Sequence, residues 1–385
     1  MTSLSPCLRL VGAAAWLTGA ALILSGCGAA PTTQTTSGGK SAATATSAAD
    51  FGGMSALITA AKKEGMLNAI ALPRDWANYG ALIEEFTKKY GIKVNDENPE
   101  GTSQDEINAI TSRQGQERAP DVVDIGSSFA LQGQQQGLFA PYKVAEFAKI
   151  PAGQAAPDGT WYNDYGGYIS IGCNAKKVAT CPKSFADLLR PEYKGMVALN
   201  GDPTQAGAAF AAVYAAALVN GGSFDTIQPG IGFFSKLKKA GNFNPVQAKQ
   251  TTVESGETPI TIDWDYLNAG YTDEFKAKGI DWQVNIPSDG KYANYYNQAI
   301  NKNAPHPAAA RLWEEYLYST EGQNLFLRGY AHPVLMSAME QADSLDKAAA
   351  AKLPAVNGTP SFPSQAQLDK AKQMLGQGWE QAVAG

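Results

Sequence analysis

Five short segments of this 385-residue chain gather aromatic, hydroxyl and carboxylate side chains. Each follows a stretch with the pattern of a β-strand. The face of an aromatic ring attracts a cation, and a carboxylate neutralises that cation and accepts its hydrogen bonds. These residue types therefore suit the capture of a small organic ligand. The segments are residues 73–79, 126–129, 200–207, 263–266 and 289–297.

Known patterns of catalysis do not occur in the sequence, which lacks a nucleophile elbow and the HExxH, P-loop and GxGxxG patterns. Its two histidines, His306 and His332, each neighbour a proline and are interpreted as parts of surface turns. We therefore expect no enzyme, no catalytic residue, no metal ion and no cofactor. A secreted hydrolase that uses Asp263 and Asp265 is the alternative from another class, and a purely structural surface lipoprotein is a third.

Composition limits the classes of function that remain for this chain. The chain carries 31 basic and 36 acidic residues, a net charge of −5, which argues against nucleic-acid binding. Hydrophobic residues make up 44%, enough to build real cores. The length fits two domains of ordinary size.

The N-terminus has the pattern of a secretory signal over residues 1–26. Arg9 precedes an apolar run at residues 10–24, which is shorter than the ~20 residues of a membrane span. The run ends in Leu24-Ser25-Gly26-Cys27, which resembles the lipobox of bacterial lipoproteins. We expect Cys27 to be lipidated and residues 27–50, rich in Ala, Thr, Ser and Gly, to form a flexible tether. The alternative is an ordinary signal peptide with an incidental cysteine.

Two cysteines remain once Cys7 leaves with the signal and Cys27 carries lipid. Cys173 and Cys181 are eight residues apart in an exported chain, and a turn-like segment separates them. This spacing predicts a disulfide, and two free thiols are the alternative.

Helical and strand patterns alternate from residue 54 onward. Helices are expected at 54–64, 79–90 and 104–114, and strands at 66–72 and 121–125; a second αβ run begins near residue 184. This order predicts an α/β fold with mostly parallel sheets and helices on both faces. Ligand sites of such sheets lie in loops beyond the carboxyl ends of the strands.

Several weak motifs, in this order and spacing, resemble the solute-binding receptors of bacterial ABC importers, extracellular family 1. The opening is similar to that of spermidine- and putrescine-binding receptors, and the likeness covers roughly residues 54–340. The resemblance implies a type II periplasmic-binding-protein-like fold of two lobes joined by a strand hinge. The motifs are Asp75-Trp76-Ala77-Asn78-Tyr79, Gly91-Ile92-Lys93-Val94, Pro120-Asp121-Val122-Val123, Ser127-Ser128-Phe129, Gln136-Gly137-Leu138-Phe139 and residues 307–323.

The expected lobes each combine two stretches of chain. Residues 51–168 with 290–340 form lobe 1, and residues 169–289 with 341–385 form lobe 2. The hinge is expected near residues 166–174 and 287–295.

The resemblance also implies ligand-binding residues. Trp76 and Tyr79 fall at aromatic contacts, Ser128 at a hydroxyl contact, and Trp264 at a ring that stacks on ligand methylenes, on the opposite wall from Trp76. Asn297 stands where polyamine receptors usually carry Asp, which also allows a mono-cation or an amino-phosphonate. The remaining expected ligand contacts are Ser127, Thr204, Asp263, Asp265 and Tyr266. Trp76 could instead pack between helix and sheet, and Asp263 and Asp265 could be turn-formers or solvated acids.

The sequence therefore predicts a monomeric, lipid-anchored, extracytoplasmic receptor of an ABC importer. It would capture a polyamine-like or other organic cation and deliver it to permease subunits in the membrane. The alternatives are a 2-aminoethylphosphonate-like ligand and ferric iron, the latter held by Tyr266, Asp265 and another acid.

Overall fold

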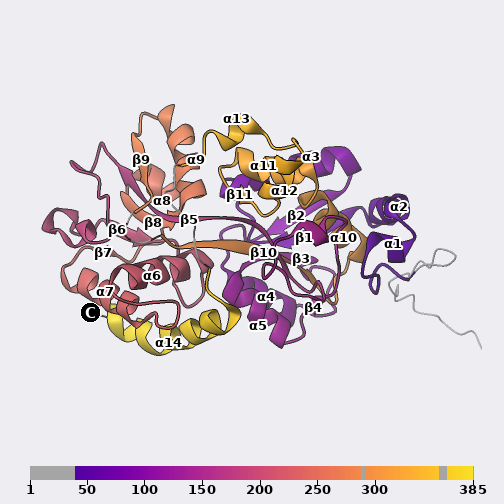
Figure 1. Ribbon diagram of the computed structural model, residues 1–385, viewed down its shortest axis with the longest axis horizontal. Coiled ribbons are helices and arrows are strands. Elements are labelled where there is room, and N and C mark those ends of the chain that lie inside the picture. Colours follow the sequence, from indigo (N-terminus) through magenta and orange to yellow (C-terminus); the bar gives the residue numbers. More distant parts are fainter. Residues whose placement is uncertain (1–39, 288, 290, 355–361, 385) are drawn as a thin grey trace, which may run out of the picture. The chain divides into compact units, whose positions relative to one another are not determined.

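Eleven strands and fourteen α-helices occur in the part of the chain that the computed structural model describes, which is residues 40–287, 289, 291–354 and 362–384 (Figure 1). The predicted signal peptide and Cys27 lie outside these residues. The strands are β1 Met66–Ile70, β2 Lys93–Glu97, β3 Val122–Gly126, β4 Phe139–Ala140, β5 Tyr162–Asn174, β6 Val197–Leu199, β7 Phe243–Asn244, β8 Ile260–Trp264, β9 Trp282–Asn285, β10 Ala293–Asn301 and β11 His332–Pro333.

The helices alternate with the strands as predicted. They are α1 Ala48–Phe51, α2 Met54–Glu64, α3 Tyr79–Tyr90, α4 Ser103–Ser112, α5 Ser127–Gln135, α6 Gly207–Val219, α7 Gln228–Lys239, α8 Gln250–Ser255, α9 Asp265–Lys276, α10 Pro307–Leu317, α11 Thr320–Arg328, α12 Met336–Gln341, α13 Lys347–Ala350 and α14 Gln365–Val383. Four short 3₁₀ helices are η1 Trp76–Asn78, η2 Phe147–Lys149, η3 Asp187–Leu189 and η4 Pro191–Tyr193.

The large sheet has the order β3-β10-β5-β8-β6-β7, with β4, β9 and β11 joined to its central strands. β1 and β2 form a separate parallel pair. The sheet is mixed, and the expectation of mostly parallel strands is wrong for it, because β5 and β10 run antiparallel to their partners. In the described part of the chain, only the β6–β7 and β6–β8 pairs of this sheet are parallel.

Strand β5 connects two parts of the large sheet. Its first half pairs with β10 as far as Tyr168, and its second half pairs with β8 from Ile169 onward. β5 and β10 therefore run side by side through the middle of the fold (Figure 1). The division into lobes at these residues stays a prediction.

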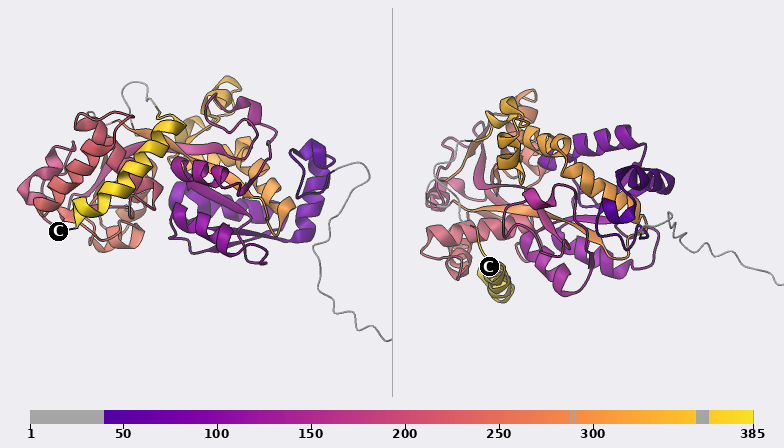
Figure 2. Two further views of the ribbon diagram at one scale, coloured as in Figure 1. Left: turned by 90° about the horizontal axis from the view of Figure 1, so that it is seen from below. Right: turned by 45° about the vertical axis from the view of Figure 1, so that its right-hand side comes forward.

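Helix burial follows the sequence pattern. In α3 the residues Leu82 and Phe86 are four apart and buried, so one face packs on the core. The Ala-rich α6 is apolar all round and buried along most of its length. α14 packs against both α7 and α5 (Figure 2), with the ring of Trp379 5.4 Å from that of Phe234.

The folded part of the chain begins before residue 50, within the segment predicted to be a flexible tether. Ala45 is fully buried, and Ser47 caps α1 by accepting a hydrogen bond from the Asp50 amide. The buried guanidinium of Arg311 donates to the carbonyls of Ala43 (3.1 Å) and Ala45 (3.0 Å). The prediction of a flexible tether is therefore wrong for residues 41–50. Low hydrophobicity suggested disorder, but a distant arginine satisfies the backbone.

Cys173 at the end of β5 and Cys181 form a disulfide, with their Cα atoms 5.8 Å apart. Among the described residues, no helix combines the length and the hydrophobicity required to cross a membrane.

Candidate functional site

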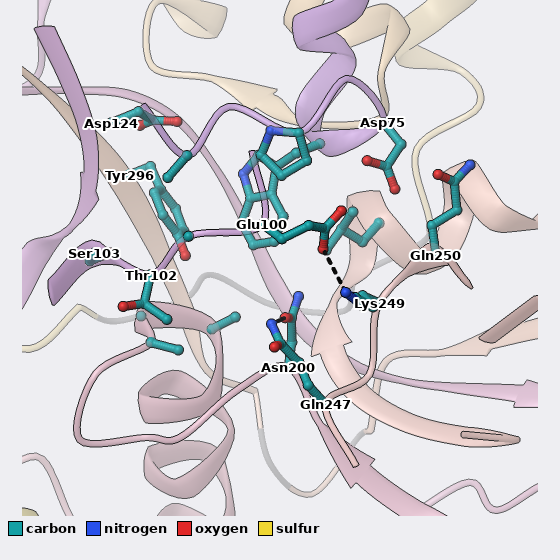
Figure 3. Close-up of a pocket in the computed structure, with 18 of the residues that line it drawn as sticks. Asp75, Glu100, Thr102, Ser103, Asp124, Asn200, Gln247, Lys249, Gln250 and Tyr296 are labelled. Carbon is teal, nitrogen blue, oxygen red and sulfur yellow. Dashed lines mark hydrogen bonds and ion pairs between the residues drawn. The ribbon is translucent and has the colours of Figure 1, made fainter. Parts of the chain in front are cut away.

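The main cavity contains about 660 Å³ of space between its lining atoms, including space that is open to solvent. Its lining comes from segments far apart in the sequence: the loop after β1, the segment leading into α4, the strands β3 and β10, the loop between β6 and α6, the start of α8, and α9 (Figure 3). The lining residues are Ala71, Pro73, Asp75, Trp76, Glu100, Gly101, Thr102, Ser103, Glu106, Asp124, Asn200, Ala206, Gly207, Ala208, Gln247, Lys249, Gln250, Leu267, Tyr271 and Tyr296.

Among the residues that the structure describes, four carboxylates and a single lysine, Lys249, line this cavity. The acids are Asp75, Glu100, Glu106 and Asp124. Lys249 Nζ lies 4.0 Å from a Glu100 carboxylate oxygen, beyond hydrogen-bonding distance (Figure 3). The cavity therefore carries an excess of acidic groups that suits a cationic ligand.

Local structure positions the acids. A capping box between Thr102 and Asp105 starts α4 and fixes the loop that carries Glu100. Glu106, on α4, is buried and accepts a hydrogen bond from the Asp124 amide at 2.9 Å. Asp75 directly precedes η1, which carries Trp76.

Burial changes the protonation of these acids. Burial, together with the charges of Glu100 and Glu274, raises the pKa of Asp75 to about 6. Burial also raises the pKa of Asp124 above its usual range, although hydrogen bonds from Tyr165 and Tyr79 oppose this. The pKa of Glu106 is raised well above its ordinary value by the same desolvation. A cation in the cavity would offset this cost and favour the ionised forms.

Among the described residues, one carboxylate oxygen of Asp124 accepts a hydrogen bond and the other does not. Its Oδ2 accepts a hydrogen bond from the Tyr165 hydroxyl (2.7 Å), which in turn accepts one from Trp76 Nε1 (2.6 Å). Its Oδ1 is buried without a partner among the described residues. The ring of Trp76 meets that of Tyr296 edge-on at 5.3 Å. Asp124 thus offers an acceptor beside two aromatic rings.

A smaller cavity of about 260 Å³ shares Gly207 and Tyr296 with the main one. Three of the predicted site residues, Ser127, Ser128 and Trp264, line it. Ser127 donates to the carbonyl of Tyr295 at 3.1 Å. Of the ten predicted ligand contacts, only Trp76 lines the main cavity.

Trp76 and Trp264 do not form opposite walls of one cavity, so that expectation is wrong. They line different cavities and both contact Tyr266 and Tyr296, with ring centroids 5.3–6.2 Å apart. The two tyrosine rings fill the space that a sandwiched ligand would need.

The other predicted contacts are bonded or packed within the protein, and a role for them in ligand binding stays a prediction. Tyr79 is fully buried and its hydroxyl accepts a hydrogen bond from Gln298. The Asp202 carboxylate accepts hydrogen bonds from the amide and the hydroxyl of Thr204 in a turn, and the buried Asp263 accepts one from Asn200 at 3.0 Å. Asp265 accepts from the Tyr168 amide, and Asn297 donates to the Ile125 carbonyl. Tyr266, which is also buried, stacks on Trp264.

Sequence reasoning missed most of the acidic lining. Asp75 adjoins Trp76, and Asp124 interrupts an otherwise apolar strand, so both gave a usable signal. Glu100, Gln247 and Lys249 lie in polar segments that resemble any surface loop, and nothing local distinguishes them. Among the described residues, no group of three His, Cys, Asp or Glu side chains could hold a metal ion.

Comparison with known proteins decides the family. The family profile described as bacterial extracellular solute-binding protein matches residues 117–357, more than half of the chain. The chain belongs to this family. Its members are binding proteins that act outside the cytoplasm, and this confirms the predicted family and location at that level.

Solved structures share the fold of this solute-binding protein. The periplasmic binding protein AfuA from Actinobacillus pleuropneumoniae, with exogenous fructose-6-phosphate bound, has a TM-score of 0.64 at 17% identity, covering 83% of this chain and 99% of its own. Iron-bound HitA from Pseudomonas aeruginosa has a TM-score of 0.59 at 22% sequence identity, and the match covers 83% of this chain and 99% of HitA. A spermidine/putrescine ABC transporter protein from Listeria monocytogenes has a TM-score of 0.57 at 15% sequence identity, and the match covers 83% of this chain and 98% of the Listeria chain. The predicted type II periplasmic-binding-protein fold is confirmed.

Proposed function

We propose that this solute-binding protein captures a small organic cation in its main cavity and delivers it to the permease of an ABC importer. The observation that carries the proposal is the lining of four carboxylates against one lysine. The fold's resemblance to a spermidine/putrescine transporter protein agrees with this ligand class.

Asp124 is the proposed contact for the ammonium group. Its buried Oδ1 has no partner among the described residues, so a ligand N–H would satisfy it. Trp76 and Tyr296 supply ring faces and edges beside it, and an ammonium near such rings gains about 0.5–2 kcal/mol.

Asp124→Asn should weaken binding of linear diamines of three to six carbons. Losing a hydrogen bond to a charged group costs about 1.5–3 kcal/mol, or roughly 10- to 150-fold in Kd. Isothermal titration calorimetry of the purified protein measures this directly. Asp164→Asn is the matched control, because Asp164 is buried but does not line the cavity. If neither a diamine nor any other organic ammonium compound binds the unmodified protein, the proposed ligand class is wrong.

We also propose that Cys27 carries the lipid that holds the receptor at the membrane. Cys27→Ala should move the protein from the membrane fraction to the soluble fraction or leave the signal uncleaved, since a lipid chain at Cys27 supplies the attachment. Fractionation followed by mass spectrometry of the N-terminal peptide checks this. A Cys27→Ala protein that is processed normally and stays with the membrane contradicts the lipid anchor.

A further inference from the structure

The two sides of the main cavity differ in chemistry. The acids Asp75, Glu100, Glu106 and Asp124 all belong to the chain between β1 and α5. The facing segments, which follow β6 and include the start of α8, carry no acid among the described lining residues. They present Asn200, Gln247, Lys249 and Gln250 (Figure 3). We call these four residues the amide–lysine wall.

Internal hydrogen bonds hold this wall in place. Gln247 Nε2 donates to Asn200 Oδ1 at 3.2 Å, and Asn200 Nδ2 donates to Asp263 Oδ2 at 3.0 Å. The carboxylate of Asp263 is buried behind the wall, so the amide group of Asn200 is fixed in orientation. Gln247 keeps a second amide hydrogen for a ligand acceptor.

Lys249 is the only cation among the described residues that line the cavity, and its charge is incompletely paired. The Glu100 oxygen 4.0 Å away is too distant for a hydrogen bond, and both side chains are partly exposed. The ammonium of Lys249 can therefore donate to an anionic group in the cavity. A second ligand ammonium at this end would instead meet a like charge.

Helix α6 adds positive potential to the cavity. Its first residues, Gly207 and Ala208, line the cavity, and its N-cap Ala206 makes no side-chain capping bond. The thirteen-residue helix thus begins at the cavity lining, with the positive end of its dipole and first N–H groups that no N-cap side chain bonds. Asp124, whose Oδ1 is buried without a partner among the described residues, lines the same cavity, so opposite charges occur in one lining.

We infer that the ligand is a short zwitterion, with an ammonium at Asp124 and a carboxylate or phosphonate at Lys249 and the start of α6. The inference rests on the proposed function, because it assumes that the cavity binds the ammonium. It narrows that function from organic cations in general to ω-amino acids and their phosphonate counterparts, and it makes a diamine the weaker ligand.

Calorimetry with matched ligands tests the zwitterion. The probes are linear ω-amino acids of three to six carbons, the ω-aminoalkylphosphonates, the diamines and the simple carboxylates of equal length. The unmodified protein should bind one of the two zwitterion classes at least tenfold more tightly than the diamine of equal length. The comparison of carboxylate with phosphonate identifies the anionic group.

Variants of Lys249 separate this inference from the proposed function. Lys249→Met should weaken the zwitterion 10- to 100-fold and change diamine binding less than threefold, and Lys249→Glu should make the diamine the preferred ligand. Lys239→Met, on the exposed side of α7, is the control and should change neither. Diamines that bind as tightly as zwitterions, or zwitterion affinity that survives Lys249→Met, overturn the inference and leave the cation receptor standing. If no ammonium ligand binds, the proposed function fails and the inference fails with it.

Discussion

Asp75 makes cation binding depend on pH. Burial and two neighbouring carboxylates raise its pKa to about 6, so the side chain becomes neutral as the pH falls below that value. A neutral carboxyl group does not attract an ammonium. Affinity for a bound diamine or amino acid should therefore be highest above pH 7 and fall as the pH drops from 7 to 5, by up to about tenfold per pH unit for one proton.

Calorimetric Kd values from pH 5 to pH 8 check this dependence. Asp75→Asn should bind more weakly at pH 7.5 and show a flatter profile, because one titrating group is removed. A profile of the unmodified protein that is flat over this range contradicts a role for Asp75 in binding.

The chemistry of single residues was predictable only in part. Trp76 was predicted from its motif, and the structure places it in the main cavity. Tyr79, three residues later, was predicted with it but points into the core, because η1 and α3 turn the chain between them. Lys249 had no sequence signal, since its position depends on long-range folding that brings the start of α8 opposite Glu100.

Among the elements, α10 holds the N-terminal segment through Arg311. This buried guanidinium bonds the carbonyls of Ala43, Ala45 and Pro307, and its cation lies 5.4 Å from the Tyr142 ring. Arg311→Met keeps much of the apolar contact but leaves these carbonyls without a donor. We expect it to lower the free energy of unfolding by about 2–4 kcal/mol.

Truncation gives a second measurement of the same contact. A protein that begins at residue 40 should unfold at the same denaturant concentration as the mature chain. A protein that begins at residue 53 should unfold earlier, because it lacks α1 and the partners of Arg311. Equal stability of the two truncated proteins would show that this segment contributes nothing.

Element order could be predicted well, and strand direction could not. The spacing of apolar residues located α2, α3 and β3 almost to the residue, because local periodicity reflects which face is buried. Nothing local shows that β5 and β10 return antiparallel to their neighbours, since pairing is decided by segments more than 100 residues apart. The composition of residues 41–50 likewise could not show that Arg311 would hold them.

At the scale of the whole molecule, α6 packs so closely against the end of β3 that the contact requires residues without a side chain. Gly126 and Gly207 contact each other there, and a Cβ built on Gly207 would lie 3.1 Å from the Tyr296 hydroxyl and 3.2 Å from the Gly126 Cα. Contacts this short force the neighbours to shift, and the backbone of Gly126 cannot rotate away as a side chain can. The two glycines therefore allow the segments on either side of the cavities to come together.

Gly207→Ala should weaken ligand binding without unfolding the protein. Gly207 begins α6 at an ordinary helical position, so alanine should stabilise the helix itself by up to about 1 kcal/mol. The added methyl group should instead hold α6 away from β3 and reduce affinity for the zwitterion or diamine about tenfold. Gly232→Ala on α7 is the matched control, because a Cβ there meets nothing within 4 Å. The measurements are calorimetric Kd and the unfolding temperature of the ligand-free protein. A lower affinity with an unchanged or higher unfolding temperature supports the view that binding requires the close contact between α6 and β3. Unchanged affinity would show that α6 adjusts to the methyl group without loss of binding.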